Sequence, residues 1–174
     1  MKRHYFIFII VVSLIPAQVM AQQCDETRPA TTPDRVFIMH EDGTVKDTRS
    51  GLLWMRCALG QSWREGRCAF SHITYEFYEA EEAAGKLNRQ GGFAGHRNWR
   101  VPTLDELASI VEQRCEDPAL NTRAFPDNPV TGYWSSSEDP DYLNGGMLVH
   151  LLNGHSYMGN KKGDWGLRLV SDGR

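Results

Sequence analysis

The sequence predicts an α+β domain in which two helices are set among short strands and long loops. Short apolar runs, bounded by Gly, Asn, Asp and Pro turns, lie on both sides of the middle of the chain. Between them, from Thr74 onward, apolar residues recur at steps of three and four, which is the period of a helix. No internal repeat or low-complexity stretch divides the chain, so we expect one domain with one core.

The first strands are expected before the first helix. Residues 35–40 have the composition of a strand, and residues 41–43 that of a turn. The segments 44–47 and 52–55 are predicted to be the two arms of a hairpin. Gly51 would supply the positive φ that such a tight connection needs.

The first helix is expected from Thr74 to about Asn88, and the pair Gly91 and Gly92 ends it. Glutamates occupy the other positions of this segment, as on a solvated helix surface. Its apolar stripe consists of Phe77, Ala80, Ala84 and Leu87.

The second helix has a clearer start signal. Thr103 follows Pro102 and precedes Glu106 by three residues, which is the spacing of a capping box. The buried stripe of this helix is expected to consist of Leu104, Leu107, Ile110 and Val111. Three further strands are then predicted, at 133–136, 147–152 and 166–170.

Residues 1–21 have the composition of a secretory signal peptide. Lys2 and Arg3 form the basic head, an apolar run follows over 5–15, and cleavage is expected after Ala21. The rival interpretation, a transmembrane anchor, needs roughly 20 apolar residues, which is more than this run has. Cleavage would leave residues 22–34 as a polar tail and predicts a periplasmic or secreted protein with no membrane span.

The net charge restricts the partners of the mature chain. Of 19 basic residues, Lys2 and Arg3 lie in the predicted signal peptide, and the remaining 17 stand against 22 acidic residues, a net charge of −5. A mildly acidic chain does not hold a nucleic acid or another polyanion by its overall charge. We therefore expect no nucleic-acid partner, while a local basic patch stays compatible with this balance.

Four cysteines, Cys24, Cys57, Cys68 and Cys115, would enter an oxidising compartment, so two disulfides are expected. Three pairings exist on paper. Cys57 and Cys68 flank one loop and are paired by proximity, which leaves Cys24 for Cys115. A metal site or a redox pair is the alternative, but the chain has no C-x-x-C spacing.

Five segments together resemble a known family: 43–55, 95–107, 125–126, 132–138 and 166–170. They are similar to the Lcl C-terminal domain family, named after a collagen-like bacterial surface adhesin, and the resemblance spans residues 35–171 within a domain of 35–174. It implies a C-type-lectin-like arrangement, with a twisted antiparallel sheet, two helices and long loops that face the ligand. The residues that carry the pattern are Trp54, Trp99, Arg100, Pro102, Trp134 and Arg168.

Two arginines in apolar surroundings are open to two interpretations. Arg100 lies between Trp99 and Val101, and Arg168 between Leu167 and Leu169. Either guanidinium could clamp an anion, but a buried arginine that organises loops by hydrogen bonds is the favoured interpretation.

Catalytic and metal sites have weak support. Ser135, Ser136 and Ser137 lack a nucleophile elbow, so they are expected to satisfy backbone groups. His150 and His155 are the closest histidine pair and only a weak zinc candidate. The densest cluster of oxygen ligands, a calcium candidate without a lectin calcium motif, is Glu138, Asp139 and Asp141 with Asn144 nearby. An ordinary solvated turn is the favoured interpretation of this cluster.

The segment 153–165 is the best candidate for a ligand-binding surface, and its glycines predict an exposed loop rather than a strand. Tyr157 and Trp165 can stack on sugar faces or on partner side chains, while His155, Lys161 and Lys162 can donate to acidic groups. The adhesin that names the family is associated with sulfated glycosaminoglycans, so the resemblance implies that such a ligand would meet the two lysines. A plain solvated hairpin is the alternative.

Three functions are weighed. The first is a non-enzymatic adhesion module that binds a glycan or a cell-surface protein, with no cofactor unless calcium takes part. The second is an accessory subunit of an envelope or pilus assembly. The third is an enzyme of the formylglycine-generating type, which needs reactive cysteines. A homo-oligomer fits the adhesin resemblance, but no collagen-like or coiled-coil stalk is present to enforce one.

Overall fold

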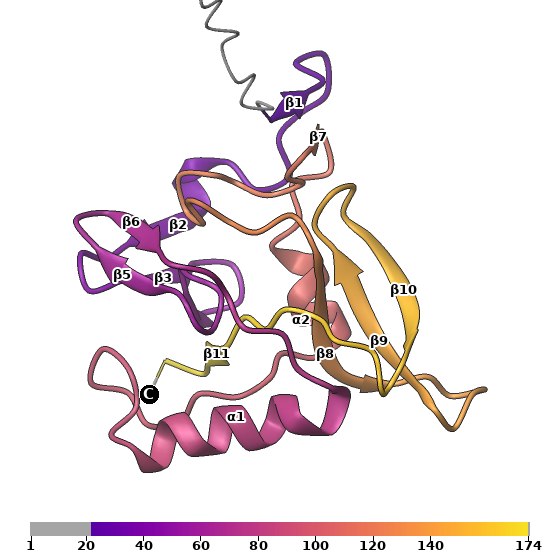
Figure 1. Ribbon diagram of the computed structural model, residues 1–174. Coiled ribbons are helices and arrows are strands. Elements are labelled where there is room, and N and C mark those ends of the chain that lie inside the picture. The colour runs from indigo at the N-terminus through magenta and orange to yellow at the C-terminus, as the bar shows by residue number, and fades with distance from the viewer. Residues whose placement is uncertain (1–21, 174) are drawn as a thin grey trace, which may run out of the picture.

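The computed structural model describes residues 22–173, whose strands and two helices confirm the α+β class (Figure 1). The predicted signal peptide, residues 1–21, lies outside the described residues. None of the described helices is both long and apolar enough to cross a membrane. The strands form two main antiparallel sheets and two short ribbons.

The four-stranded sheet has the order β11-β4-β3-β2. The predicted hairpin is confirmed, with Gly51 at a φ of 77° in its turn. The strand predicted at 35–40 is shorter than expected, because residues 34–36 form a 3-10 turn (η1) before it. The strands are β2 (Phe37–Met39), β3 (Thr44–Asp47), β4 (Leu53–Met55) and β11 (Val170–Ser171).

The strand predicted at 166–170 is mostly irregular. Gly166 forms an isolated parallel bridge with Tyr133, and regular pairing with β4 begins only at Val170. The segment is nevertheless fixed, because the carbonyls of Leu167 and Leu169 accept backbone hydrogen bonds from the β4 region. It thereby connects the two main sheets.

The three-stranded sheet has the order β10-β9-β8. Its strands are β8 (Gly132–Glu138), β9 (Gly145–His150) and β10 (His155–Asn160). The prediction that 153–165 is a loop is wrong, because β10 pairs with β9 over its whole length. This position of the strand requires glycine, because a Cβ there would lie 2.7 Å from Leu148 Cδ2 and 2.9 Å from a Trp134 ring carbon. Gly159 is a close-contact glycine and not a turn glycine.

Both predicted disulfides are confirmed. Cys24 bonds Cys115 across 91 residues of sequence, and Cys57 bonds Cys68 across 11. Each bridge staples a short ribbon that the sequence analysis did not predict. The ribbons pair β1 (Gln23–Cys24) with β7 (Cys115–Glu116) and β5 (Ser62–Arg64) with β6 (Arg67–Ala69).

The helix α1 (Phe77–Arg89) begins three residues after the predicted start at Thr74. Tyr75 cannot join it, because its N–H and C=O are both bonded to the backbone of Trp165. Glu76 then takes the N-cap position and forms a capping box with Glu79.

The helix α2 (Leu104–Ser109) confirms the predicted capping box, since the Thr103 side chain accepts from the Glu106 N–H. It is shorter than expected. Val111, expected in its buried stripe, instead forms an isolated bridge with Leu120. Leu107, Ile110 and Val111 of the predicted stripe are buried and Leu104 is half-buried, although the helix ends before the stripe does.

The two helices pack against opposite faces of the three-stranded sheet. Trp134 and Leu148 belong to an apolar cluster with Phe77 of α1. On the opposite face, Tyr133 and Val149 belong to the second cluster, which includes Leu107 of α2. Strand β10 extends beyond this core and presents mostly exposed residues.

Candidate functional site

Arg168 is a structural residue, as the sequence analysis favoured. It is fully buried, and Nη1 donates to the carbonyls of Met55 (2.8 Å) and Arg56 (2.6 Å). Its guanidinium carbon lies 4.8 Å from the centre of the Phe125 ring. All these partners are parts of the protein itself, so Arg168 holds the core together and offers nothing to an anion.

Arg100 is also occupied by the protein, although it is only half-buried. Its two Nη atoms donate to both carboxylate oxygens of Glu106, at 2.7 and 2.8 Å, and Nη2 also reaches Asp172 at 2.8 Å. The Glu106 carboxylate raises the pKa of Arg100, and Arg100 in turn lowers the pKa of Glu106. Glu106 thus caps α2 and anchors Arg100, so two carboxylates already fill the predicted anion clamp.

The serine side chains of β8 make backbone contacts, as expected. Ser135 Oγ donates to the Met147 carbonyl at 2.7 Å, and Ser136 Oγ donates to the Pro102 carbonyl at 3.3 Å. Ser137 Oγ accepts from the Leu104 N–H at the start of α2, at 3.0 Å. These contacts join β8 to β9 and α2.

Lys161 is buried, which differs from the exposed donor predicted in the sequence. Its Nζ lies 3.1 Å from Glu138 Oε2, 2.9 Å from the Leu143 carbonyl and 3.2 Å from the Tyr78 hydroxyl. It therefore closes the β8–β9 loop and does not face a ligand. Lys162, next to it, is exposed.

The same contacts occupy part of the calcium candidate. Glu138 is bonded to Lys161, and Asp139 Oδ1 accepts from the N–H groups of Asp141 and Tyr142. Within residues 22–173, no group of three or more His, Cys, Asp and Glu side chains is arranged to hold a metal ion. The Asp139 contacts are those of a turn closed by its own side chain.

Three of the predicted binding residues do come together: His155 and Tyr157 lie in β10, Trp165 follows that strand, and all three lie around His150 of β9. We call His150, His155, Tyr157 and Trp165 the hairpin cluster. The His150 ring centre lies 6.4 Å from that of Tyr157 and 6.3 Å from that of Trp165, in edge-to-face geometry, and His155 lies 6.5 Å from Tyr157. The cluster arises because His150 faces His155 in the ladder and residues two apart share a face.

The polar atoms of the hairpin cluster are oriented by the turn beside it. The Asn153 side-chain amide donates to the Tyr157 hydroxyl at 2.9 Å. His150 Nδ1 accepts from the Leu152 N–H at 3.2 Å, so the proton of the neutral ring is on Nε2. Tyr157 remains 44% exposed, with one ring edge fixed and the rest of the ring open to solvent.

A hollow of about 300 Å³ adjoins the hairpin cluster. Its polar lining comes from three parts of the chain: Arg28 in the N-terminal segment, Gln113 after α2, and Asn153 with His155 in the hairpin. Sequence analysis missed Arg28 and Gln113, because nothing local marks residues that the fold brings to the hairpin from so far away. The hairpin cluster and this hollow form the candidate site.

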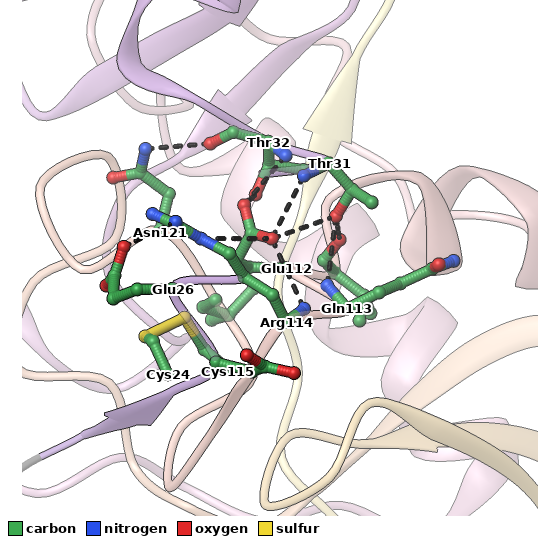
Figure 2. A network of polar contacts seen from close by, with 12 residues as sticks. Cys24, Glu26, Thr31, Thr32, Glu112, Gln113, Arg114, Cys115 and Asn121 are labelled. Carbon is green, nitrogen blue, oxygen red and sulfur yellow. Dashed lines mark hydrogen bonds and ion pairs between the residues drawn. A yellow bond between two sulfur atoms is a disulfide. The ribbon is translucent and has the colours of Figure 1, made fainter. Parts of the chain in front are cut away.

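The N-terminal segment that carries Arg28 is held by a buried carboxylate. Figure 2 shows Glu112 among its donors: its two oxygens accept from the N–H and hydroxyl groups of Thr31 and Thr32, at 2.8 to 3.2 Å. The Arg114 N–H adds a fifth hydrogen bond at 3.3 Å. The disulfide of Cys24 lies in the same network. Residues 22–34 are therefore fixed against the domain and are not a free tail.

We expect Glu112→Gln to lower the free energy of unfolding at neutral pH by about 2 kcal/mol, because an amide nitrogen cannot accept these hydrogen bonds. Burial raises the pKa of Glu112, but the hydrogen bonds from residues 31, 32 and 114 outweigh it, so the pKa is lowered. A carboxyl group whose pKa is lower in the folded protein stabilises the fold at pH values above its pKa in the unfolded chain, about 4.3. This stabilisation is lost as the pH falls through the pKa of the folded state.

Denaturant unfolding of the two proteins between neutral and acidic pH measures this contribution. The stability difference should shrink as the pH falls below about 4. Glu116→Gln is the matched control, since Glu116 is exposed and close in sequence. A difference that stays constant with pH would contradict the role assigned to Glu112.

The geometry defines a small α+β domain, stapled by two disulfides, with an exposed aromatic and histidine surface on its last hairpin. The sequence matches the Lcl C-terminal domain family over residues 43–171, so the chain belongs to this family. The resemblance inferred from the five segments is confirmed. No curated protein matches the chain.

Proposed function

We propose that the protein is a non-enzymatic binding module that recognises a glycan at the hairpin cluster and the hollow beside it. The observation that carries the proposal is the convergence of exposed His155 and Tyr157 on β10 with half-buried His150 and Trp165 beside them. Exposed aromatic rings offer flat apolar faces to the C–H groups of a sugar, and fixed polar groups beside them select its hydroxyls.

The charge beside the hairpin cluster comes from Arg28 and not from Lys161. Lys161 is ion-paired with Glu138, whereas Arg28 lines the hollow next to His155 and is exposed. An acidic sugar substituent bound there would meet Arg28 and the Gln113 amide. The proposed ligand is therefore a glycan with a carboxylate or sulfate group, whose binding weakens as salt rises.

The C-type-lectin-like arrangement and the periplasmic or secreted location belong to the same proposal. Two helices, long loops and antiparallel sheets support the first. Two disulfides support the second, because such bridges form in oxidising compartments. An enzyme of the formylglycine-generating type would need reactive thiols, and all four cysteines of the chain are in disulfides.

One observation favours the second candidate function, an accessory subunit of an envelope assembly. Leu143, at the tip of the β8–β9 loop, is 85% exposed, and Tyr142 next to it is 49% exposed. A partner protein would cover such side chains. In that case, substitutions at this tip would reduce recovery of an envelope complex and leave glycan binding unchanged.

The test is a glycan array with purified residues 22–174, at low and high salt and with and without calcium, followed by calorimetry on the best ligand. We expect Tyr157→Ala and Arg28→Ala each to weaken binding on the order of tenfold. Tyr142→Ala is the matched control, an equally exposed tyrosine outside the site. No binding to any glycan, or equal losses for Tyr142 and Tyr157, would overturn the proposal.

A further inference from the structure

Strand β10 is an unprotected sheet edge. It is the outer strand of the three-stranded sheet, and within residues 22–173 no other strand pairs with its free side (Figure 1). Five of its six residues are exposed, and the sixth, Gly159, is half-buried. A free edge of this length is a template for another strand.

The ladder shows which backbone groups point outward. In an antiparallel pair, the N–H and C=O of one residue point to the same side, and the side alternates along the strand. The Leu151 N–H bonds to the Thr131 carbonyl on the β8 side, so His150 points toward β10 and its partner His155 points back. By alternation, Ser156, Met158 and Asn160 point their N–H and C=O groups away from β9, and the Asn160 carbonyl already accepts from the Gly163 N–H.

The strand lacks the devices that keep sheet edges apart. Its sequence, His155-Ser-Tyr-Met-Gly-Asn160, contains no Lys, Asp, Glu or Pro and no bulge. The other sheet edges differ. β2 has three residues and β11 two, while β8 is interrupted by a bulge and covered in part by the bridge to Gly166. Among the described strands, β10 combines length, exposure and absence of charge.

We propose that β10 pairs antiparallel with β10 of a second copy, which joins two three-stranded sheets into one of six strands. A twofold axis through Tyr157 places Ser156 of each copy opposite Met158 of the other. The outward N–H and C=O groups of Ser156 and Met158 in each strand then find partners, in four hydrogen bonds across the axis. Because the strand is uncharged, no like charges face each other, and the two exposed Tyr157 rings lie side by side.

A second copy fits the edge better than an unrelated peptide does, because in this register an identical strand supplies hydrogen-bond partners to the outward groups of Ser156 and Met158. It also deepens the proposed function, on which this step rests. Tyr157 shares a sheet face with His155 and His150, so pairing brings two hairpin clusters onto one continuous face. A glycan chain with repeated units would then bind both copies and gain avidity.

The test uses sedimentation velocity of residues 22–174 over a dilution series, without any glycan. We expect a reversible dimer. The variant S156K/M158K places introduced lysines opposite each other at both cross-strand pairs and should weaken dimerisation tenfold or more. The charge-swapped variant S156K/M158E places an introduced lysine opposite an introduced glutamate and should restore the dimer, which no other register predicts.

Circular dichroism and thermal unfolding of both variants check that the fold is kept. A monomer at all concentrations would overturn the proposal, as would a dimer that both variants leave unchanged, or one that both abolish. Binding of a different protein strand to a monomeric wild type would identify another occupant and also overturn it. These outcomes are independent of glycan binding, because sedimentation without glycan tests the dimer alone, whereas glycan binding by the wild type tests the proposed function whether or not the protein dimerises.

Discussion

Arg168→Met is expected to lower the free energy of unfolding by about 4 kcal/mol. The variant keeps much of the apolar stem but leaves the carbonyls of Met55 and Arg56 buried without a donor. The half-buried side chain of Asn128, which also accepts from Arg168, keeps the Tyr133 hydroxyl as a donor. Each buried acceptor left unsatisfied costs roughly 1 to 3 kcal/mol, so the two carbonyls together account for a loss of this size.

Within residues 22–173, carbonyl groups and aromatic faces surround this guanidinium in place of a carboxylate counter-ion. Burial lowers the pKa of Arg168, yet a guanidinium remains charged at neutral pH. Arg168→Lys should recover less than half of the loss, because an ammonium lacks the planar fork that reaches two carbonyls and an amide at once.

Denaturant unfolding followed by tryptophan fluorescence measures the effect of the Arg168 substitutions. The matched control is Arg67→Met, which removes an exposed arginine paired with Asp127 and should leave the free energy of unfolding nearly unchanged. If Arg168→Met and Arg67→Met were equally stable, the buried guanidinium would not be an organising group of the core.

The parts of the fold that the sequence predicted have local causes. The capping box at Thr103 and Glu106 and the turn at Gly51 each depend on residues a few positions apart. The errors have distant causes. The glycines of 153–165 predict a loop, but Gly159 is required by close contact with Leu148 of β9 and Trp134 of β8. The early end of α2 likewise follows from the Val111 bridge to Leu120.

The candidate site shows the same division. Apolar neighbours in the sequence were enough to predict a structural Arg168, and the turn at 153–154 pairs His150 with His155. The burial of Lys161 was not predictable in this way, because its partner Tyr78 is 83 positions away. Arg28 enters the site only because distant groups fix the N-terminal segment to the domain. The last prediction therefore concerns this attachment.

Removing the Cys24–Cys115 bridge is expected to destabilise the protein more than removing Cys57–Cys68. The first bridge closes a chain segment of 91 residues and the second one of 11. Loop-closure entropy of the unfolded chain then gives a loss of roughly 4 to 5 kcal/mol for the first and roughly 3 kcal/mol for the second. Paired Cys→Ser variants, unfolded by denaturant, measure the difference.

The two paired Cys→Ser variants also separate the effect of each bridge on the unfolded chain from its effect on contacts in the folded protein. Glu112 and the Cys24–Cys115 bridge hold the same segment, so Glu112→Gln should cost less in the C24S/C115S background than in the wild type. In the C57S/C68S background its cost should be unchanged, because that bridge lies in the other ribbon. Two outcomes would show that the N-terminal segment is not held by the bridge and the carboxylate together: equal losses of unfolding free energy for the two bridges, or an equal cost of Glu112→Gln in both backgrounds. Arg28 would then have to reach the hairpin by other contacts.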